Sequence, residues 1–181
     1  MRIVKWISKN HSIYKTLMEK IYNDRKDRKV DTSKGNIYAP HIIGVKVENM
    51  VEAILKNKGY KILDIVLVYE VTNKDNKLIH TLCEFDARYQ DENGDIVILE
   101  IKYATSDKAF ARARKLCNRK DEKFKSLFRV TSLLILNFDY SDITMTTDLE
   151  LKPRVDDSYT HNYIKYADLV NMYQSLYNSH K

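Results

Sequence analysis

Cysteine is scarce in this chain, and the two that are present, Cys83 and Cys117, are too few for a disulfide framework. They lack the paired spacing of a zinc site, and neither has a histidine partner in sequence that would make it a nucleophile. The five histidines are scattered, without HxH or HxxxH pairing. These features predict a reducing, intracellular setting, either cytoplasmic or nuclear.

Glycine and proline are also rare, with 4 and 2 copies. No glycine-rich loop is available to cradle a nucleotide phosphate, and no G-x-S-x-G elbow occurs, which disfavours both of those hydrolytic chemistries. No apolar run approaches the roughly 20 residues that a membrane span requires. The N-terminus has no apolar core long enough for a signal peptide. We therefore expect no transmembrane segment and no membrane partner.

The composition predicts one globular domain. The chain has 181 residues, of which 44% are hydrophobic, enough for a sizeable core. We divide residues 1–181 into a basic N-terminal helix and loop (1–38), a core (39–140) and a C-terminal extension with a helix (141–181). The 13 tyrosines, with abundant lysine, isoleucine and asparagine, suggest an AT-rich genome such as that of a virus or mobile element.

The net charge of +6 is unevenly distributed. Residues 1–38 carry 10 basic and 4 acidic side chains, and residues 102–129 carry 10 and 3, whereas the remainder is acidic overall. Two basic segments flanking an acidic body favour binding to a phosphate backbone, although solvated helix faces would produce the same bias. The candidate contacts fall at helical spacing within the second segment: Lys108, Arg112, Lys115 and Arg119.

Hydrophobic periodicity and turn residues predict alternating helices and strands. Thr105 or Ser106 can cap the helix that follows the third strand. The order of these helices and strands along the chain predicts an α/β sandwich around a mixed sheet. The expected helices cover 8–27, 40–58, a stretch after 106, and 159–177, and the expected strands cover 60–72, 78–90, 95–103, 131–138 and, at an edge, 142–151.

The segment from 83 to 103 carries the most specific signal, because it predicts a hairpin. Asn93-Gly94 favours a tight turn, since glycine tolerates positive φ. A three-residue loop over 92–94, with Gly94 in the left-handed region, would place Asp91 opposite Asp95. Counting back from that pair then sets the register of both strands.

This register would bring Asp86 opposite Glu100, with Lys102 on the same face as Glu100. Two carboxylates can hold a hard divalent cation, and a nearby lysine can stabilise negative charge or help activate a water. Acid-x-lysine triplets also arise by chance in a lysine-rich chain; the nearest rival is residues 150–152. Only the triplet at Glu100 ends a buried strand and has a hairpin-paired acid.

These residues resemble the PD-(D/E)XK nuclease superfamily, which has the restriction-endonuclease-like fold, over about residues 40–138. The resemblance implies an α-β-β-β-α-β core with a mixed central sheet flanked by helices. Asp86 matches the acid of the middle strand, and Glu100, Ile101 and Lys102 match the acid-x-lysine element. Glu48 matches the helix glutamate, with Glu52, one turn later, as the alternative.

The resemblance implies a metal-dependent nuclease that hydrolyses phosphodiester bonds, with DNA as the expected partner. Asp86, Glu100, the carbonyl of Ile101, and Glu48 directly or through water, would bind Mg²⁺ or Mn²⁺. Lys102 would orient or deprotonate the attacking water, or stabilise the developing charge. The alternative is a non-catalytic nucleic-acid-binding accessory module on the same fold. Endonuclease or exonuclease action, DNA or RNA as substrate, and a homodimer all remain open.

Overall fold

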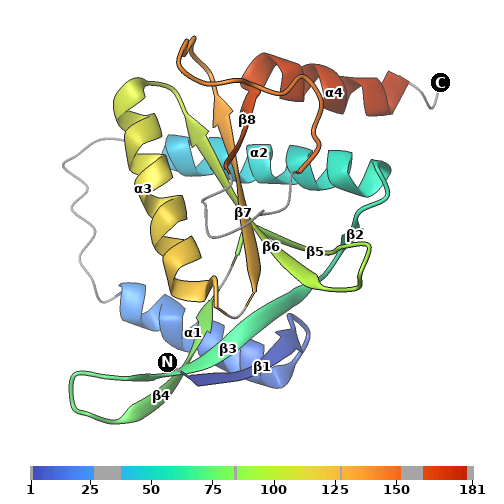
Figure 1. The fold of residues 1–181 in the computed structure, drawn as a ribbon. Coiled ribbons are helices and arrows are strands. Elements are labelled where there is room, and N and C mark those ends of the chain that lie inside the picture. Colours follow the sequence, from blue (N-terminus) through green and yellow to red (C-terminus); the bar gives the residue numbers. More distant parts are fainter. Residues whose placement is uncertain (1, 27–37, 84, 127, 152–160, 179–181) are drawn as a thin grey trace. The chain divides into compact units, whose positions relative to one another are not determined.

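The structure is a computed structural model that describes residues 2–26, 38–83, 85–126, 128–151 and 161–178 (Figure 1). The chain forms two compact units: Met1–Ile37 with Asp64–Phe85, and Tyr38–Leu63 with Asp86–Lys181. One division falls between Ile37 and Tyr38, next to the expected boundary at residue 38, and residues 64–85 group with the N-terminal segment. Every helix in the described part of the chain is too short or too polar to span a bilayer.

The first unit is a three-stranded antiparallel sheet with one helix packed against it. The strand order is β1-β3-β4, where β1 is Arg2–Ser8, β3 is Ile65–Thr72 and β4 is Leu78–Cys83. The helix α1 (Ser12–Lys26) agrees with the helix expected over 8–27. Its apolar side chains pack against buried residues of the sheet, namely Ile7, Val66, Val68 and Leu82.

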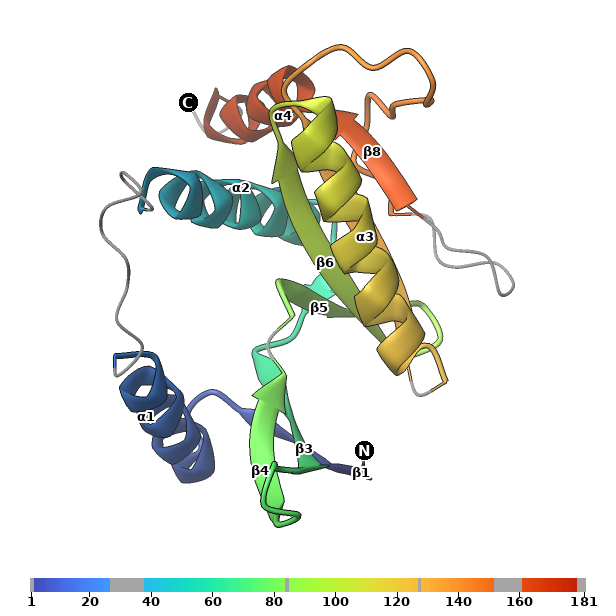
Figure 2. The ribbon, with the colours of Figure 1, turned by 90° about the vertical axis from the view of Figure 1, so that its left-hand side faces the viewer.

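The second unit is a five-stranded mixed sheet with helices on both faces (Figures 1 and 2). The strand order is β2-β5-β6-β7-β8, with antiparallel pairing from β2 to β6 and parallel pairing from β6 to β8. This agrees with the expected α/β class. In chain order the elements are α2 (Tyr38–Asn57), β2 (Lys61–Ile62), β5 (Ala87–Gln90), β6 (Ile96–Ala104), α3 (Asp107–Phe124), β7 (Arg129–Leu136), β8 (His161–Lys165) and α4 (Tyr166–Asn178).

Alternation along β7 divides the core of this unit between the two faces. Leu133 packs in one cluster with residues of α2 and α4, whereas Leu134 packs in another with Phe110 and Cys117 of α3. All of β7 after Arg129 is buried, as predicted for the strand over 131–138. The side chain of Ser106 caps α3 by accepting a hydrogen bond from the Ala109 amide (3.3 Å), so of the two predicted caps the second is used.

Two predicted strands are each divided between the two sheets. The run over 60–72 becomes β2 and β3, and the run over 78–90 becomes β4 and β5. The first break falls at Leu63 and Asp64, and a single polar residue within an apolar run is a weak turn signal. The strand β1 was not predicted, since its pairing with β3 joins segments far apart in the chain.

The C-terminal expectations need two corrections. Residues 142–151 do not form the edge strand; they contribute only an isolated bridge from Thr146 to Ile164, and β8 occupies the edge. The helix expected from residue 159 begins at Tyr166, because residues 161–165 pair with β7 instead. Burial alternates from residue to residue along β8, which is typical of a strand. Five residues are too few for this pattern to be separated, in the sequence, from the periodicity of the helix that follows.

The hairpin between β5 and β6 has the predicted register. Gly94 has φ of 85°, and its amide donates to the Asp91 carbonyl over 3.0 Å. The Asp91 amide donates to the Asp95 carbonyl over 2.9 Å, which closes the three-residue loop. Pairing continues from Gln90 with Ile96 to Ala87 with Leu99. The next pair in this register is Asp86 with Glu100.

We expect Gly94→Ala to lower the free energy of unfolding by about 1–2 kcal/mol, because alanine is strained at positive φ. Gly44→Ala is the matched control: it lies inside α2, and an added Cβ there would meet no heavy atom within 4 Å. This control should raise stability by about 0.5–1 kcal/mol through helix propensity. Urea unfolding of both variants measures the two changes in the free energy of unfolding. Equal effects of the two substitutions would contradict the role of the turn.

Candidate active site

Three side chains of the hairpin converge at its open end, away from the turn. The Lys102 ammonium lies 2.8 Å from Asp86 Oδ2 and 2.6 Å from Glu100 Oε1. It also donates to the carbonyl oxygen of Ile101 over 2.9 Å. Asp86, Glu100 and Lys102 are therefore brought together as the sequence predicted, and three oxygens surround one cation.

The two carboxylates are held in different ways. Asp86 Oδ2 accepts a hydrogen bond from the Ile101 amide over 2.7 Å, so the main chain of β6 fixes the position of this side chain. The Glu100 side chain is only 3% exposed, whereas those of Asp86 and Lys102 are 17% and 25% exposed. A carboxylate as buried as Glu100 needs a permanent partner of opposite charge.

The environment of Lys102 favours its protonated form. Burial acts to lower its pKa, but the charges and hydrogen bonds of Asp86 and Glu100 outweigh burial and hold the pKa above the ordinary lysine value. In this arrangement Lys102 is a cation that can stabilise negative charge. The raised pKa is unfavourable for the predicted alternative in which Lys102 deprotonates water.

The helix α2 brings Glu48 to this cluster. The pKa of Glu48 is raised to about 7, mainly by burial and also by the charge of Asp86, while the charge of Lys102 acts in the opposite direction. Glu52 is engaged elsewhere, in an ion pair of 2.6 Å with Lys56 on the helix surface. Of the two helix glutamates considered from the sequence, the structure thus joins Glu48 to the candidate site.

A second lysine was not anticipated. Lys120 on α3 forms an ion pair with Glu100 Oε2, so each oxygen of this carboxylate has its own ammonium. The spacing of Phe110, Ala113 and Cys117 defines the buried face of α3, and position 120 continues that spacing. Helical periodicity could therefore have identified Lys120 as facing inward.

The four predicted nucleic-acid contacts lie on the outer surface of α3. Lys108, Arg112, Lys115 and Arg119 are all exposed. Lys108 and Arg112 line a cavity of about 400 Å³ together with Lys102. A neighbouring cavity of about 450 Å³ is lined by Glu48, Lys102 and Tyr103, among others. Lys102 thus borders both cavities, one toward α2 and one toward the basic side chains of α3.

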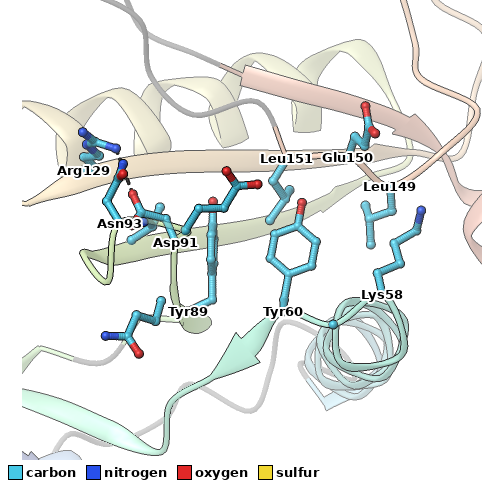
Figure 3. Close-up of a pocket in the computed structure, with 13 residues that line it drawn as sticks. Lys58, Tyr60, Tyr89, Asp91, Asn93, Arg129, Leu149, Glu150 and Leu151 are labelled. Carbon is cyan, nitrogen blue, oxygen red and sulfur yellow. Dashed lines mark hydrogen bonds and ion pairs between the residues drawn. The ribbon is translucent and has the colours of Figure 1, made fainter.

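A further cavity of about 610 Å³ is lined by none of the predicted site residues (Figure 3). Tyr60 and Tyr89 meet edge to face in its wall with ring centroids 5.1 Å apart. Arg129 pairs with Asp91 over 2.8 Å at one side. Because Asp91 also accepts hydrogen bonds from the turn, these polar groups stabilise the hairpin and the start of β7.

Two other reactive side chains lie near Glu100 in the interior. Burial lowers the pKa of His161 to about 4, and the charge of Arg114 adds to this shift. The ring Nδ1 of His161 is hydrogen-bonded to the Ser132 hydroxyl. Burial raises the pKa of the Cys117 thiol to about 12, helped by the charge of Glu100. At neutral pH the imidazole is uncharged and the thiol is protonated, which disfavours nucleophilic chemistry by this cysteine.

The oxygen atoms that surround the Lys102 ammonium are suitable ligands for a hard divalent cation. Asp86, Glu100 and the Ile101 carbonyl offer oxygen ligands, which Mg²⁺ and Mn²⁺ prefer, and they already surround one positive group. Among the residues that the structure describes, no group of three or more His, Cys, Asp or Glu could by itself hold a metal ion. A metal here would therefore need the carbonyl oxygen as well as the carboxylates, and it would compete with Lys102.

Comparison with family models, with curated proteins and with solved structures finds no match for this chain.

Glu48→Gln should stabilise the folded protein at pH 8 but not at pH 4, in the presence of a chelator. Below the ordinary glutamate value of 4.5 the group is protonated in both states. As pH rises toward about 7, the unfolded chain loses this proton while the folded chain retains it, so stability falls. Allowing for solvent screening of this half-buried group, we expect a gain of about 1 kcal/mol for the variant.

Thermal or urea unfolding at the two pH values measures this difference. Glu52→Gln is the control, since its exposed ion pair with Lys56 contributes only a few tenths of a kcal/mol. Equal stabilities of the parent and the Glu48 variant at pH 8 would show that Glu48 is well solvated.

Proposed function

We propose that this protein is a nuclease that uses Mg²⁺ or Mn²⁺ to hydrolyse phosphodiester bonds, with DNA as the substrate. The observation that carries the proposal is the convergence of Asp86 Oδ2, Glu100 Oε1 and the Ile101 carbonyl on one cationic position. This set was expected from the PD-(D/E)XK resemblance, and it depends on the hairpin register. A solvated strand end would have no reason to bury Glu100.

The order of elements supports assignment to the restriction-endonuclease-like fold. In the second unit, α2, β2, β5, β6, α3 and β7 follow one another as α-β-β-β-α-β, apart from the segment that carries β3 and β4. The first three strands pair antiparallel and β7 joins β6 in parallel, as expected for a mixed central sheet. The candidate residues lie on α2, on β6 and just before β5.

The side chains would divide the work between binding and charge stabilisation. Asp86, Glu100 and the Ile101 carbonyl would hold the metal, with Glu48 joining directly or through water. The metal, when bound, supplies a Lewis acid that lowers the pKa of a water ligand and neutralises phosphate charge. Lys102, displaced from the carboxylates, would pair with the phosphate under attack and stabilise its charge.

Glu48 is better suited than Lys102 to receive a proton from water. In the absence of metal its pKa of about 7 lies close to neutral pH, where a general base is most effective, and this role requires that Glu48 reach the metal through water because direct coordination would lower that pKa. The cavity that Glu48 shares with Lys102 would allow both side chains to contact the same phosphate. In this division of roles, Lys102 orients the substrate and Glu48 accepts the proton.

The exposed basic side chains of α3 provide a path for the phosphate backbone. Lys108 and Arg112 line the same cavity as Lys102, so a strand held by them would have a phosphate near the candidate metal ligands. Lys115 and Arg119 extend the path along the helix, because positions 108, 112, 115 and 119 share one face. Such contacts bind nucleic acid irrespective of its sequence.

Asp86→Asn and Lys102→Ala should each reduce metal-dependent cleavage by about a hundredfold or more, because each removes a group that acts directly on the metal or phosphate. Glu52→Gln is the control and should cleave like the parent. The assay uses linear duplex, single strand, supercoiled circle and four-way junction, with Mg²⁺, Mn²⁺ or chelator, and product lengths distinguish endonuclease from exonuclease action. Unchanged rates in both variants would exclude this mechanism.

Arg112→Ala should weaken binding of duplex DNA at every sequence tested. It should also reduce the slope of log affinity against log salt by about 1, because one phosphate contact is lost. Fluorescence anisotropy at several salt concentrations measures both quantities, with chelator present to prevent cleavage. Lys74→Ala, in the exposed turn between β3 and β4, is the control. An equal loss of DNA affinity in the two variants would mean that binding depends on net charge alone.

The alternative function, a non-catalytic nucleic-acid-binding module, has one observation in its favour. Both oxygens of Glu100 are already paired with lysines, which is a stable arrangement without any metal. This alternative predicts salt-sensitive binding with no cleavage in Mg²⁺ or Mn²⁺. The substrate panel therefore separates the two functions directly.

A further inference from the structure

The Glu100 carboxylate has two cationic partners with different surroundings. Lys102 contacts Oε1 and shares its ammonium with Asp86 and the Ile101 carbonyl. Lys120 contacts Oε2 from the buried side of α3, and its side chain is 30% exposed. A metal bound by Asp86 and Glu100 would take the position near Oε1, which leaves the contact of Lys120 with Oε2 intact.

Acidic and basic side chains gather on the face of the second unit's sheet that packs against α3. Side chains alternate along β5 and β6, so Arg88 projects to the same face as Asp86 and Glu100. Asp121, which follows Lys120 on α3, lines a small cavity with Glu100. Arg88, Glu100 and Asp121 are all buried. Together with the partly buried groups, three acids and three cations lie on this face, namely Asp86, Glu100 and Asp121 with Arg88, Lys102 and Lys120. Glu48 adds a fourth acid from α2, and its pKa is raised to about 7.

We propose that Lys120 is a positioning residue that holds Glu100 and couples divalent-cation binding to nucleic-acid binding. This inference rests on the metal site of the proposed function. A divalent cation entering the free protein meets carboxylates that lysines already neutralise in part, and Lys120 repels it across the Glu100 carboxylate. A phosphate beside Lys102 adds negative charge that favours the cation. The metal consequently binds weakly to the free protein and more tightly once nucleic acid is present.

The helix α3 links the two binding events physically. Its outer face carries the exposed cations proposed to contact phosphates, while its inner face carries Lys120 against Glu100. The two sets of side chains are adjacent in sequence at Arg119 and Lys120. Coupling of this kind is reciprocal, so the metal must tighten nucleic-acid binding by the same factor by which nucleic acid tightens metal binding.

The test measures binding of Mn²⁺ to the full-length protein by electron paramagnetic resonance, with and without a short duplex oligonucleotide. Lys120→Gln removes the positive charge but retains a hydrogen-bond donor for Glu100. This variant should bind Mn²⁺ about tenfold more tightly than the parent without DNA, a typical size for such coupling. Lys120→Arg should restore the parent affinity. Lys125→Met, an exposed lysine paired with Glu122 near the end of the same helix, is the charge control and should bind like the parent.

A second measurement uses the parent protein alone and therefore does not depend on the folding of any variant. Its Mn²⁺ affinity should rise about tenfold in the presence of duplex, after subtraction of Mn²⁺ bound by the duplex itself, and the duplex affinity should rise equally with Mn²⁺. A parent affinity unchanged by DNA, or a Lys120→Gln variant no tighter than the parent, would overturn the coupling.

A cleavage assay of the parent separates this inference from the proposed function. If the parent cleaves DNA in Mn²⁺ but shows no coupling, the role of Lys120 is wrong and the nuclease function stands. If coupling is present without cleavage, the nuclease function fails and the positioning role of Lys120 stands.

Discussion

The three-residue turn at Gly94 is the constraint on which the candidate site depends. It pairs Gln90 with Ile96, and the register carried back along β5 sets Asp86 opposite Glu100. A slip of one residue would move one of these acids to the other face of the sheet. Arg129, at the start of β7, binds the Asp91 carboxylate over 2.8 Å, so the turn is also fastened to the neighbouring strand. The arrangement of charges at one end of the hairpin is therefore determined by backbone conformation at the other.

That arrangement brings like charges together at a cost to the folded state. Asp86 and Glu100 lie close enough to share one ammonium, and Glu48 approaches them from α2. The elevated pKa of Glu48 shows that a third negative charge is unfavourable here once the side chain is partly buried. Lys102 and Lys120 offset the repulsion between the other two acids. Such opposed charges are common at functional sites and also occur in structural ion-pair networks.

Local pattern was sufficient to predict the elements that build the site, and insufficient for those that depend on distant pairing. The turn at Gly94, the apolar run of β7 and the cap at Ser106 are encoded within a few residues, and each agrees with the structure. By contrast, β1 is stabilised by pairing with β3, and β8 by pairing with β7, and both partners lie far away in the sequence. Lys120 belongs to the basic segment over 102–129, whose net charge favours phosphate binding, but the spacing of Phe110 and Cys117 places it on the inward face of α3.

The two faces of α3 carry charges of the same sign but of unequal effect on the site. Lys108, Arg112, Lys115 and Arg119 are exposed, so salt screens their interactions beyond about 8–10 Å. Lys120 contacts a carboxylate that is 3% exposed, where screening by ions is much weaker. Because it contacts Glu100 directly, this inward-facing lysine can influence the charge of the candidate metal site more than an exposed cation that makes no such contact. The outer cations would bring the substrate to the helix, whereas the inner one would govern how readily the two carboxylates accept a metal.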